Sequence, residues 1–358
     1  MLARRIAQQA PLSVADYMAL ALTDPECGYY MGRDPLGARG DFVTAPEVSQ
    51  MFGELVGLWC ADAWQRLGEP AEILLVELGP GRGTLMADAL RAARPLPAFG
   101  DALRVHLVEI SPALRACQAE TLASVAPTWL DDLADLPEGP LLLIANEFFD
   151  ALPVRQLVKT AAGWCERQVT LADSPRDAAP AFAFGLSAPW PDAQSAVPAV
   201  LRGAPEGALF ETSPSAAHMA AEIGRRLAAH GGAAVIIDYG HGQSATGETL
   251  QSVRGHARHD VLADPGSADL TCHVDFAALA RAAREAGAET HGPVGQGAWL
   301  RRLGIEARAA GLTERATPAQ QKDIRTALDR LTGAEQMGDL FKVLALAAPG
   351  FGPPAGFA

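Results

Sequence analysis

The sequence has too few cysteines, too widely scattered, for a disulfide or zinc framework. Its 358 residues include five cysteines with no Cys-x-x-Cys pair, and His256 and His259 stand close together without partner ligands. This pattern is typical of reduced, mostly buried thiols in a cytosol-like compartment. We therefore predict no metal site and expect a cytoplasmic protein.

Long apolar runs and an excess of positive charge are also missing. No apolar run reaches the roughly 18 residues of a membrane helix, and the arginine-containing N-terminus lacks the apolar core of a signal peptide. The 42 acidic and 29 basic side chains give a net charge of −13. Such a surface repels nucleic acid and anionic lipid, so we expect no nucleic-acid partner and no membrane insertion. A cationic partner is better suited to this negatively charged surface. The sequence does not indicate an oligomeric state.

An alternation of strands and helices is present instead. Continuous apolar strands separated by helices predict an α/β fold with a mostly parallel, Rossmann-like sheet covered by helices on both faces. The predicted strands are 72–78, 104–109, 140–145, 233–238 and 340–347. The predicted helices are 12–22, a long one over 45–66, 83–94, 111–124, 275–286 and most of 296–332.

These elements suggest a division of the chain into five segments. Residues 1–70 form an N-terminal helical cap and loop, and 71–150 and 232–347 form the two halves of a cofactor-binding core with helical additions. Residues 151–231 are an insertion for the substrate, with strand-like pieces at 154–159 and 164–171 and a loop-like stretch over 173–207. Residues 348–358 are expected to be a disordered tail.

A glycine-rich turn lies between the first predicted core strand and its helix. It reads Glu77-Leu-Gly79-Pro-Gly81-Arg-Gly83-Thr84. Its glycines allow a ligand to approach the backbone closely, and the helix N-terminus favours an anionic group. The dinucleotide pattern G-x-G-x-x-G/A fails at Thr84, so an NAD-linked oxidoreductase is the weaker alternative. The spacing E-x-G-x-G-x-G is that of the S-adenosyl-L-methionine (SAM) turn of class I methyltransferases.

Acidic residues follow the next strands. Glu109 ends the second strand, where a carboxylate can bind a ribose diol in either cofactor class. Asp132 lies near a third strand, where it could meet the adenine amino group or belong to a solvated turn. Asn146, Glu147 and Asp150 follow the strand at 140–145. Their side chains could orient a nitrogen nucleophile, bind a guanidinium and act as base; alternatively, Asp150 caps a turn and Glu147 is solvated.

Several motifs together resemble the MidA-like methyltransferases, whose mitochondrial members are the complex I assembly factor that dimethylates an arginine. The resemblance covers roughly residues 11–347 and rests on the following strings: GDFVTAPEVSQMFGELVGLW, ELGPGRGTLMADALR, LIANEFFDALPVRQL, FETSPSAA, DYGH and DLTCHVDFAALA. It implies a class I methyltransferase fold with extra N-terminal helices and a substrate-side α+β insertion. It also implies a mitochondrial-matrix location if the protein is eukaryotic.

The resemblance further implies symmetric dimethylation of an arginine in the 49-kDa-type subunit of respiratory complex I, or its bacterial equivalent, in support of assembly. Matched motif by motif, it assigns cofactor contacts to Gly40, Asp41, Phe42, Thr44, Gly79, Gly81, Gly83 and Glu109, methyl-side contacts to Asn146 and Glu147, and an arginine pocket to Glu211, His241 and Asp269 to His273. A SAM-binding assembly chaperone without catalysis and a small-molecule methyltransferase are further alternatives.

Overall fold

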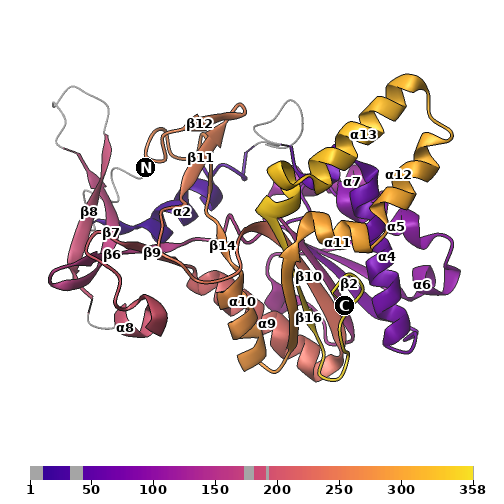
Figure 1. Ribbon diagram of the computed structural model, residues 1–358, viewed down its shortest axis with the longest axis horizontal. Coiled ribbons are helices and arrows are strands. Elements are labelled where there is room, and N and C mark those ends of the chain that lie inside the picture. The colour runs from indigo at the N-terminus through magenta and orange to yellow at the C-terminus, as the bar shows by residue number, and fades with distance from the viewer. Residues whose placement is uncertain (1–10, 33–42, 173–180, 191–192, 358) are drawn as a thin grey trace.

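The computed structural model describes residues 11–32, 43–172, 181–190 and 193–357. The predicted parallel strands form the centre of an eight-stranded sheet with the order β15-β16-β10-β5-β2-β3-β4 (Figure 1). Neighbouring strands from β10 to β4 are parallel, β16 is antiparallel to both its neighbours, and β14 pairs with the end of β10. The strands are β2 Ile73–Leu78, β3 Leu103–Val108, β4 Thr128–Leu130, β5 Leu141–Asn146, β10 Gly232–His241, β14 Val274–Asp275, β15 Glu289–Gly295 and β16 Phe341–Ala347.

The apolar strands are buried because helices cover both faces of this sheet. In β5, Leu142 and Ile144 face one core, whereas Leu141, Leu143 and Ala145 face the other, as strand alternation requires. The first core is closed by α4 Gln50–Arg66, α5 Thr84–Ala93, α6 Pro97–Ala102, α11 Gln296–Arg302, α12 Ile305–Thr313 and α13 Pro318–Thr332. The second is closed by α9 Pro214–His230 and α10 Phe276–Glu285. The predicted α/β class is confirmed.

A second group of strands lies to the left of the core in Figure 1. Its main sheet contains β1, β7, β6 and β9 in that order, and β8 also pairs with β7. Helix α2 packs its buried face on this group, and α8 packs on the opposite side. The elements are β1 Leu12–Ser13, α2 Val14–Thr23, β6 Arg155–Thr160, β7 Gly163–Leu171, β8 Phe182–Pro189, α8 Ala193–Ala196 and β9 Leu209–Thr212. A small sheet of β11 Gln251–Arg254, β12 Ala257–His259 and β13 Asp269–Thr271 lies above it.

The predicted single helix over 45–66 is wrong. The chain forms α3 Ala45–Val48 and then α4, with extended backbone at Ser49 (φ −166°) between them. The Ser49 Oγ accepts a hydrogen bond from the Met51 N–H at 3.2 Å. The apolar spacing did not reveal the break, because serine can cap a new helix within a continuous apolar stripe.

Two segments expected to be irregular are structured. The stretch 173–207 contains β8, α8 and a short 3₁₀ turn, although residues 173–180 and 191–192 lie outside the described part of the chain. The tail was expected to be disordered, but Phe351 and Phe357 pack on the first core. Arg66 Nη1 also donates to the Pro353 carbonyl at 2.8 Å. Burial of the two phenyl rings holds the tail on the core although it forms no helix or strand.

Candidate functional site

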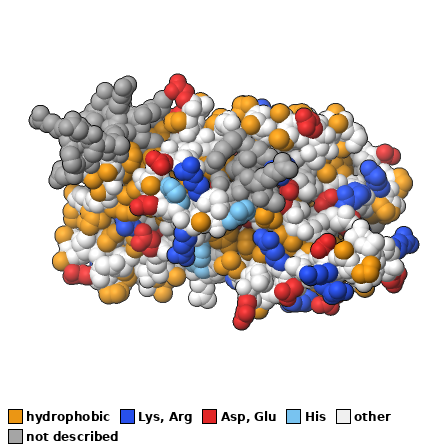
Figure 2. Space-filling model, turned by 90° about the horizontal axis from the view of Figure 1, so that it is seen from above, with side chains coloured by type: hydrophobic (Ala, Val, Ile, Leu, Met, Phe, Trp, Pro, Cys, Tyr) orange, Lys and Arg blue, Asp and Glu red, His pale blue; other side chains and the backbone are white. Residues whose placement is uncertain are grey.

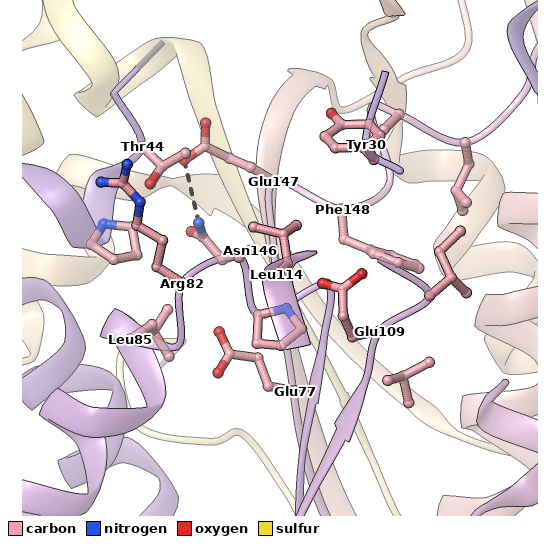
Figure 3. Close-up of a pocket in the computed structure, with 18 of the residues that line it drawn as sticks. Tyr30, Thr44, Glu77, Arg82, Leu85, Glu109, Leu114, Asn146, Glu147 and Phe148 are labelled. Carbon is pink, nitrogen blue, oxygen red and sulfur yellow. Dashed lines mark hydrogen bonds between the residues drawn. The ribbon is translucent and has the colours of Figure 1, made fainter. Parts of the chain in front are cut away.

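A pocket of about 270 Å³ opens at the carboxyl ends of β2, β3 and β5. The strand order places β3 on one side of β2 and β5 on the other, so this is the switch point where open α/β sheets bind ligands. Figure 3 shows Glu77, Glu109, Asn146 and Glu147 around the pocket, with Tyr30 and Phe148 above Glu109. The glutamates that the sequence places at the ends of three different strands therefore line the same pocket.

The glycine-rich turn forms one wall. Gly79, Gly81 and Gly83 all have left-handed backbone, with φ of +57°, +55° and +79°. A Cβ on Gly79 would lie 2.8 Å from Cδ2 of Phe148, which leaves no room for a side chain. Gly79 and Gly81 line the pocket, whereas Gly83 lies at the N-cap of α5. Thr84, which breaks the dinucleotide pattern, donates from Oγ1 to Glu47 Oε1 at 2.6 Å and so ties α5 to α3.

Two buried acceptors on the pocket wall have no protein partner within the described ranges. Glu77 Oε2 and Asn146 Oδ1 accept no hydrogen bond, and their residues are 3% and 8% exposed. Burial raises the pKa of Glu77 to about 8. A ligand that brings an ammonium group would satisfy both acceptors and favour the ionised carboxylate. The amino-acid end of SAM fits this requirement, whereas a pyrophosphate would add negative charge beside Glu77.

Glu109 is fixed by a residue that the sequence alone did not reveal. Glu109 Oε1 accepts from the Ser111 N–H at 2.7 Å, and Oε2 accepts from Gln118 Nε2 at 3.2 Å. The same Nε2 donates to the Gly81 carbonyl at 2.7 Å, and Trp129 Nε1 donates to Gln118 Oε1 at 2.8 Å. Gln118 therefore links Glu109 to the glycine turn. Its only signal in the sequence was a polar residue on the core-facing side of α7 (Pro112–Thr121).

We expect Gln118→Leu to weaken S-adenosylhomocysteine binding by roughly tenfold. The change removes a hydrogen bond to a buried carboxylate, an interaction of about 1.5–3 kcal/mol, and leaves Trp129 Nε1 without an acceptor. Calorimetric titration of the purified variant measures the effect. An affinity equal to that of the parent protein would show that Gln118 does not organise the pocket.

Glu147 lies at the pocket edge in strained backbone. Its φ is +50°, and Oε1 accepts from the Ala45 N–H at 3.1 Å and from Asn146 Nδ2 at 3.3 Å (Figure 3). Burial, with the nearby charge of Asp150 adding to it, raises the pKa of Glu147 to about 8. The alternative of a freely solvated Glu147 is therefore wrong. A glutamate with left-handed backbone conformation in a pocket indicates a functional constraint, because this conformation costs about 1–3 kcal/mol.

Asp150 does not line the pocket, contrary to its predicted place beside Glu147 at the reacting group. It is 7% exposed, and burial raises its pKa to about 6. Asp238, in β10, is fully buried, and its Oδ2 accepts from the N–H groups of Phe149 and Asp150 at 3.0 and 3.1 Å. This bonding fixes the turn after Glu147, and Asp150 influences Glu147 through its charge without lining the pocket.

The other predicted cofactor contacts fall into two groups. Thr44 and Asp132 line the pocket; Asp132 is exposed, and its Oδ1 caps a 3₁₀ turn by accepting from the Ala134 N–H at 2.9 Å. Gly40, Asp41 and Phe42 lie outside the described residues.

The predicted arginine-pocket residues lie outside this cavity. Glu211 accepts from Gln156 Nε2 at 2.8 Å and from the Leu250 N–H at 3.2 Å, so it holds the chain near 250. The His273 ring packs edge-on against Tyr239 with centroids 5.5 Å apart, and burial together with the charge of His241 lowers its pKa. Asp269 Oδ1 accepts from the Tyr30 hydroxyl at 2.9 Å. Figure 2 shows a few separate histidine side chains on the face seen from above, among side chains of both charges.

Comparison with known proteins decides between the two cofactor classes. The family model described as "Putative S-adenosyl-L-methionine-dependent methyltransferase" matches residues 55–294. The chain belongs to this family. It is a SAM-dependent methyltransferase with the class I fold, so the NAD-linked alternative and the non-catalytic chaperone are set aside.

Individual relatives span almost the whole chain. The chain is 38% identical to "Protein arginine methyltransferase NDUFAF7 homolog, mitochondrial" of Drosophila melanogaster, over 96% of this chain and 83% of that protein. It is 37% identical to the human protein arginine methyltransferase NDUFAF7, over 96% and 81%. A crystal structure from Burkholderia thailandensis bound to S-adenosyl-homocysteine has a TM-score of 0.85 at 32% identity, covering 100% of this chain and 93% of that chain.

In the described part of the chain, no helix has the length and apolarity needed to cross a membrane. The same residues contain no group of three or more histidine, cysteine, aspartate and glutamate side chains placed to hold a metal ion.

Proposed function

We propose that this methyltransferase acts on the guanidinium group of an arginine in a protein. The observation that carries the proposal is Glu147: a carboxyl in the cofactor pocket, held by Ala45 and Asn146, with a pKa of about 8. Two relatives named protein arginine methyltransferases support it. The net charge of −13 suits a cationic target.

The cofactor contacts in this proposal follow the pocket walls. Gly79 and Gly81 give the amino-acid half of SAM close access to backbone, and Glu77 and Asn146 accept hydrogen bonds from its ammonium group. Glu109 takes the ribose hydroxyls, Asp132 and Thr44 lie at the rim, and Gly83 lets α5 begin beside the turn.

The reaction needs a neutral nucleophile. SAM supplies an activated methyl group on its sulfonium sulfur. An arginine side chain is protonated, with a pKa above about 12, so one proton must leave as the nitrogen–carbon bond forms and the sulfur–carbon bond breaks. Glu147 orients the guanidinium through its carboxylate and receives that proton, and Asn146 fixes the Glu147 side chain. The entering cation favours the ionised form of Glu147, which makes the base available on substrate binding.

We further propose the 49-kDa-type subunit of NADH:quinone oxidoreductase, or its bacterial counterpart, as the substrate, with symmetric dimethylation supporting assembly. The motif resemblance supports this choice. The insertion 151–231 is the proposed contact for that subunit, and Glu211, His241, Asp269 and His273 are proposed to shape the arginine approach.

The test is to incubate the purified protein with methyl-deuterated SAM and the host's 49-kDa-type subunit and to sequence the product by mass spectrometry. We expect one arginine to gain two labelled methyl groups, and fragmentation to release monomethylamine, as symmetric dimethylation requires. A subunit that remains unlabelled, or a label found only on lysine, would contradict the proposal.

The rate should depend on pH through Glu147. A raised pKa means that the carboxyl is protonated, and inactive as a base, below that pKa. We expect kcat/KM for the protein substrate to rise with pH and level off at or below about pH 8, because burial raises the pKa of Glu147 to about 8 and a nearby cation would lower it again. The inflection should lie well above the ordinary glutamate pKa of about 4.3. A flat profile between about pH 5 and 9 would exclude a titrating base of this kind.

A further inference from the structure

Tyr30 contacts both the cofactor pocket and the segment that carries Asp269 and His273. Its ring lines the pocket above Glu109 (Figure 3), and its hydroxyl donates to Asp269 Oδ1 at 2.9 Å. Tyr30 follows α2, whereas Asp269 lies in β13, more than half the chain away in sequence. The Tyr30 side chain therefore reaches from the pocket of the central sheet to β13 of the small sheet.

The backbone of Tyr30 is bonded to the proposed ribose-binding residue through Ser111. Ser111 Oγ donates to the Tyr30 carbonyl at 2.6 Å, and the Ser111 N–H donates to Glu109 Oε1 at 2.7 Å. Ser111 is fully buried. The hydrogen bonds thus form one continuous path of Glu109, Ser111, Tyr30 and Asp269.

The far end of this path connects to the turn that follows Glu147. Asp269 Oδ1 also accepts from the Leu270 N–H at 3.0 Å, and the Cys272 N–H donates to the Asp150 carbonyl at 2.9 Å. The segment 269–273 is therefore attached at one point to Tyr30 and at another to the turn that follows Glu147.

We propose that Tyr30 is a positioning residue, through which cofactor binding further stabilises the segment 269–273 on the proposed substrate side. A cofactor that packs on the Tyr30 ring and bonds to Glu109 restricts both ends of Tyr30. Its hydroxyl then holds Asp269 more firmly, so the substrate meets a more rigid segment once the cofactor has bound. The inference rests on the proposed placement of the cofactor ribose at Glu109 but not on arginine as the substrate.

Hydrogen exchange measured with S-adenosylhomocysteine tests this link without any protein substrate. In the parent protein, saturating S-adenosylhomocysteine should slow exchange of the amides of residues 270–273 by about fivefold, the order expected when one hydrogen bond is stabilised. In Tyr30→Phe, with the ligand at ten or more times that variant's own dissociation constant, the slowing should disappear. If the enzyme proved to methylate a residue other than arginine, the expected change in hydrogen exchange would stay the same, so the two proposals can fail separately.

The matched control is Tyr17→Phe. Tyr17 is a buried tyrosine on α2 whose hydroxyl donates to the Val261 carbonyl at 2.7 Å, away from the pocket. The Tyr17→Phe variant loses a comparable hydrogen bond, yet the ligand should still slow hydrogen exchange of residues 270–273. If Tyr30→Phe does not fold, Ser111→Ala removes the Oγ bond to Tyr30 and should reduce the slowing. Ser111 also caps α7 by accepting from the Leu114 N–H, and Ser213 caps α9 in the same way, so Ser213→Ala is the control and should not reduce the slowing.

Three results would overturn the proposal. The first is the absence of slowing in the parent protein when the ligand is bound. The second is an undiminished slowing in Tyr30→Phe or, where that variant does not fold, in Ser111→Ala. The third is a folded Tyr30→Phe that no longer binds S-adenosylhomocysteine, because the hydroxyl would then act in cofactor binding itself.

Discussion

Glu147→Gln should reduce methyl transfer to the protein substrate by at least about 100-fold, the usual contribution of a general base. Glutamine keeps the shape of the side chain and can still accept from the Ala45 N–H, but it cannot receive a proton or balance a guanidinium charge. Single-turnover rates at saturating SAM measure the loss directly.

Two measurements separate this result from a general defect. S-adenosylhomocysteine affinity should stay near that of the parent protein, because Glu147 is proposed to act on the nucleophile and not on the cofactor. Glu120→Gln, on the exposed side of α7, should transfer methyl groups at the parent rate. Unchanged turnover in Glu147→Gln would reject the role of base.

Gly81→Val should weaken S-adenosylhomocysteine binding by at least about 100-fold. The backbone at Gly81 has a φ of +55°, a conformation that costs a β-branched residue about 1–3 kcal/mol, and the residue lines the pocket. A valine side chain would therefore both distort the turn and occupy space needed by the cofactor. Calorimetric titration gives the affinity.

Gly68→Val is the matched control, because it carries the same backbone strain away from the pocket. Gly68 has a φ of +83°, and a Cβ there would meet no atom within 4 Å. We expect this variant to lose stability but to bind S-adenosylhomocysteine normally. If Gly81→Val bound normally as well, the glycine turn could not be the cofactor site.

The sequence predicted the central strands well, because their signal is local. Runs such as ILLVEL in β2 and LLLIAN in β5 are apolar on both faces, which only a sheet covered on both sides accommodates. The glycine turn, Glu109 and Glu147 could be placed in one pocket because parallel strands end at a common edge. These inferences needed only the order of elements.

The sequence could not show features that depend on contacts between distant residues. Gln118 lies 37 residues from its partner Gly81, and Tyr30 bonds to a residue 239 positions away. Asp150 stands close to Glu147 in sequence, yet the hydrogen bonds from the backbone N–H groups of Phe149 and Asp150 to Asp238 fix a turn that leaves Asp150 outside the pocket. The packing of the C-terminal tail could not be predicted for the same reason, because its hydrogen-bond partners lie on α4 and α11.

A crystal structure of this protein with S-adenosylhomocysteine tests the central claim most directly. The account predicts that the ligand sulfur faces Asn146 and Glu147, that the ribose hydroxyls bond to Glu109, and that the ammonium group reaches Glu77 or Asn146. A ligand bound in the opposite direction, with adenine beside Glu147, would leave no path from that carboxylate to the methyl position and would contradict the proposed mechanism.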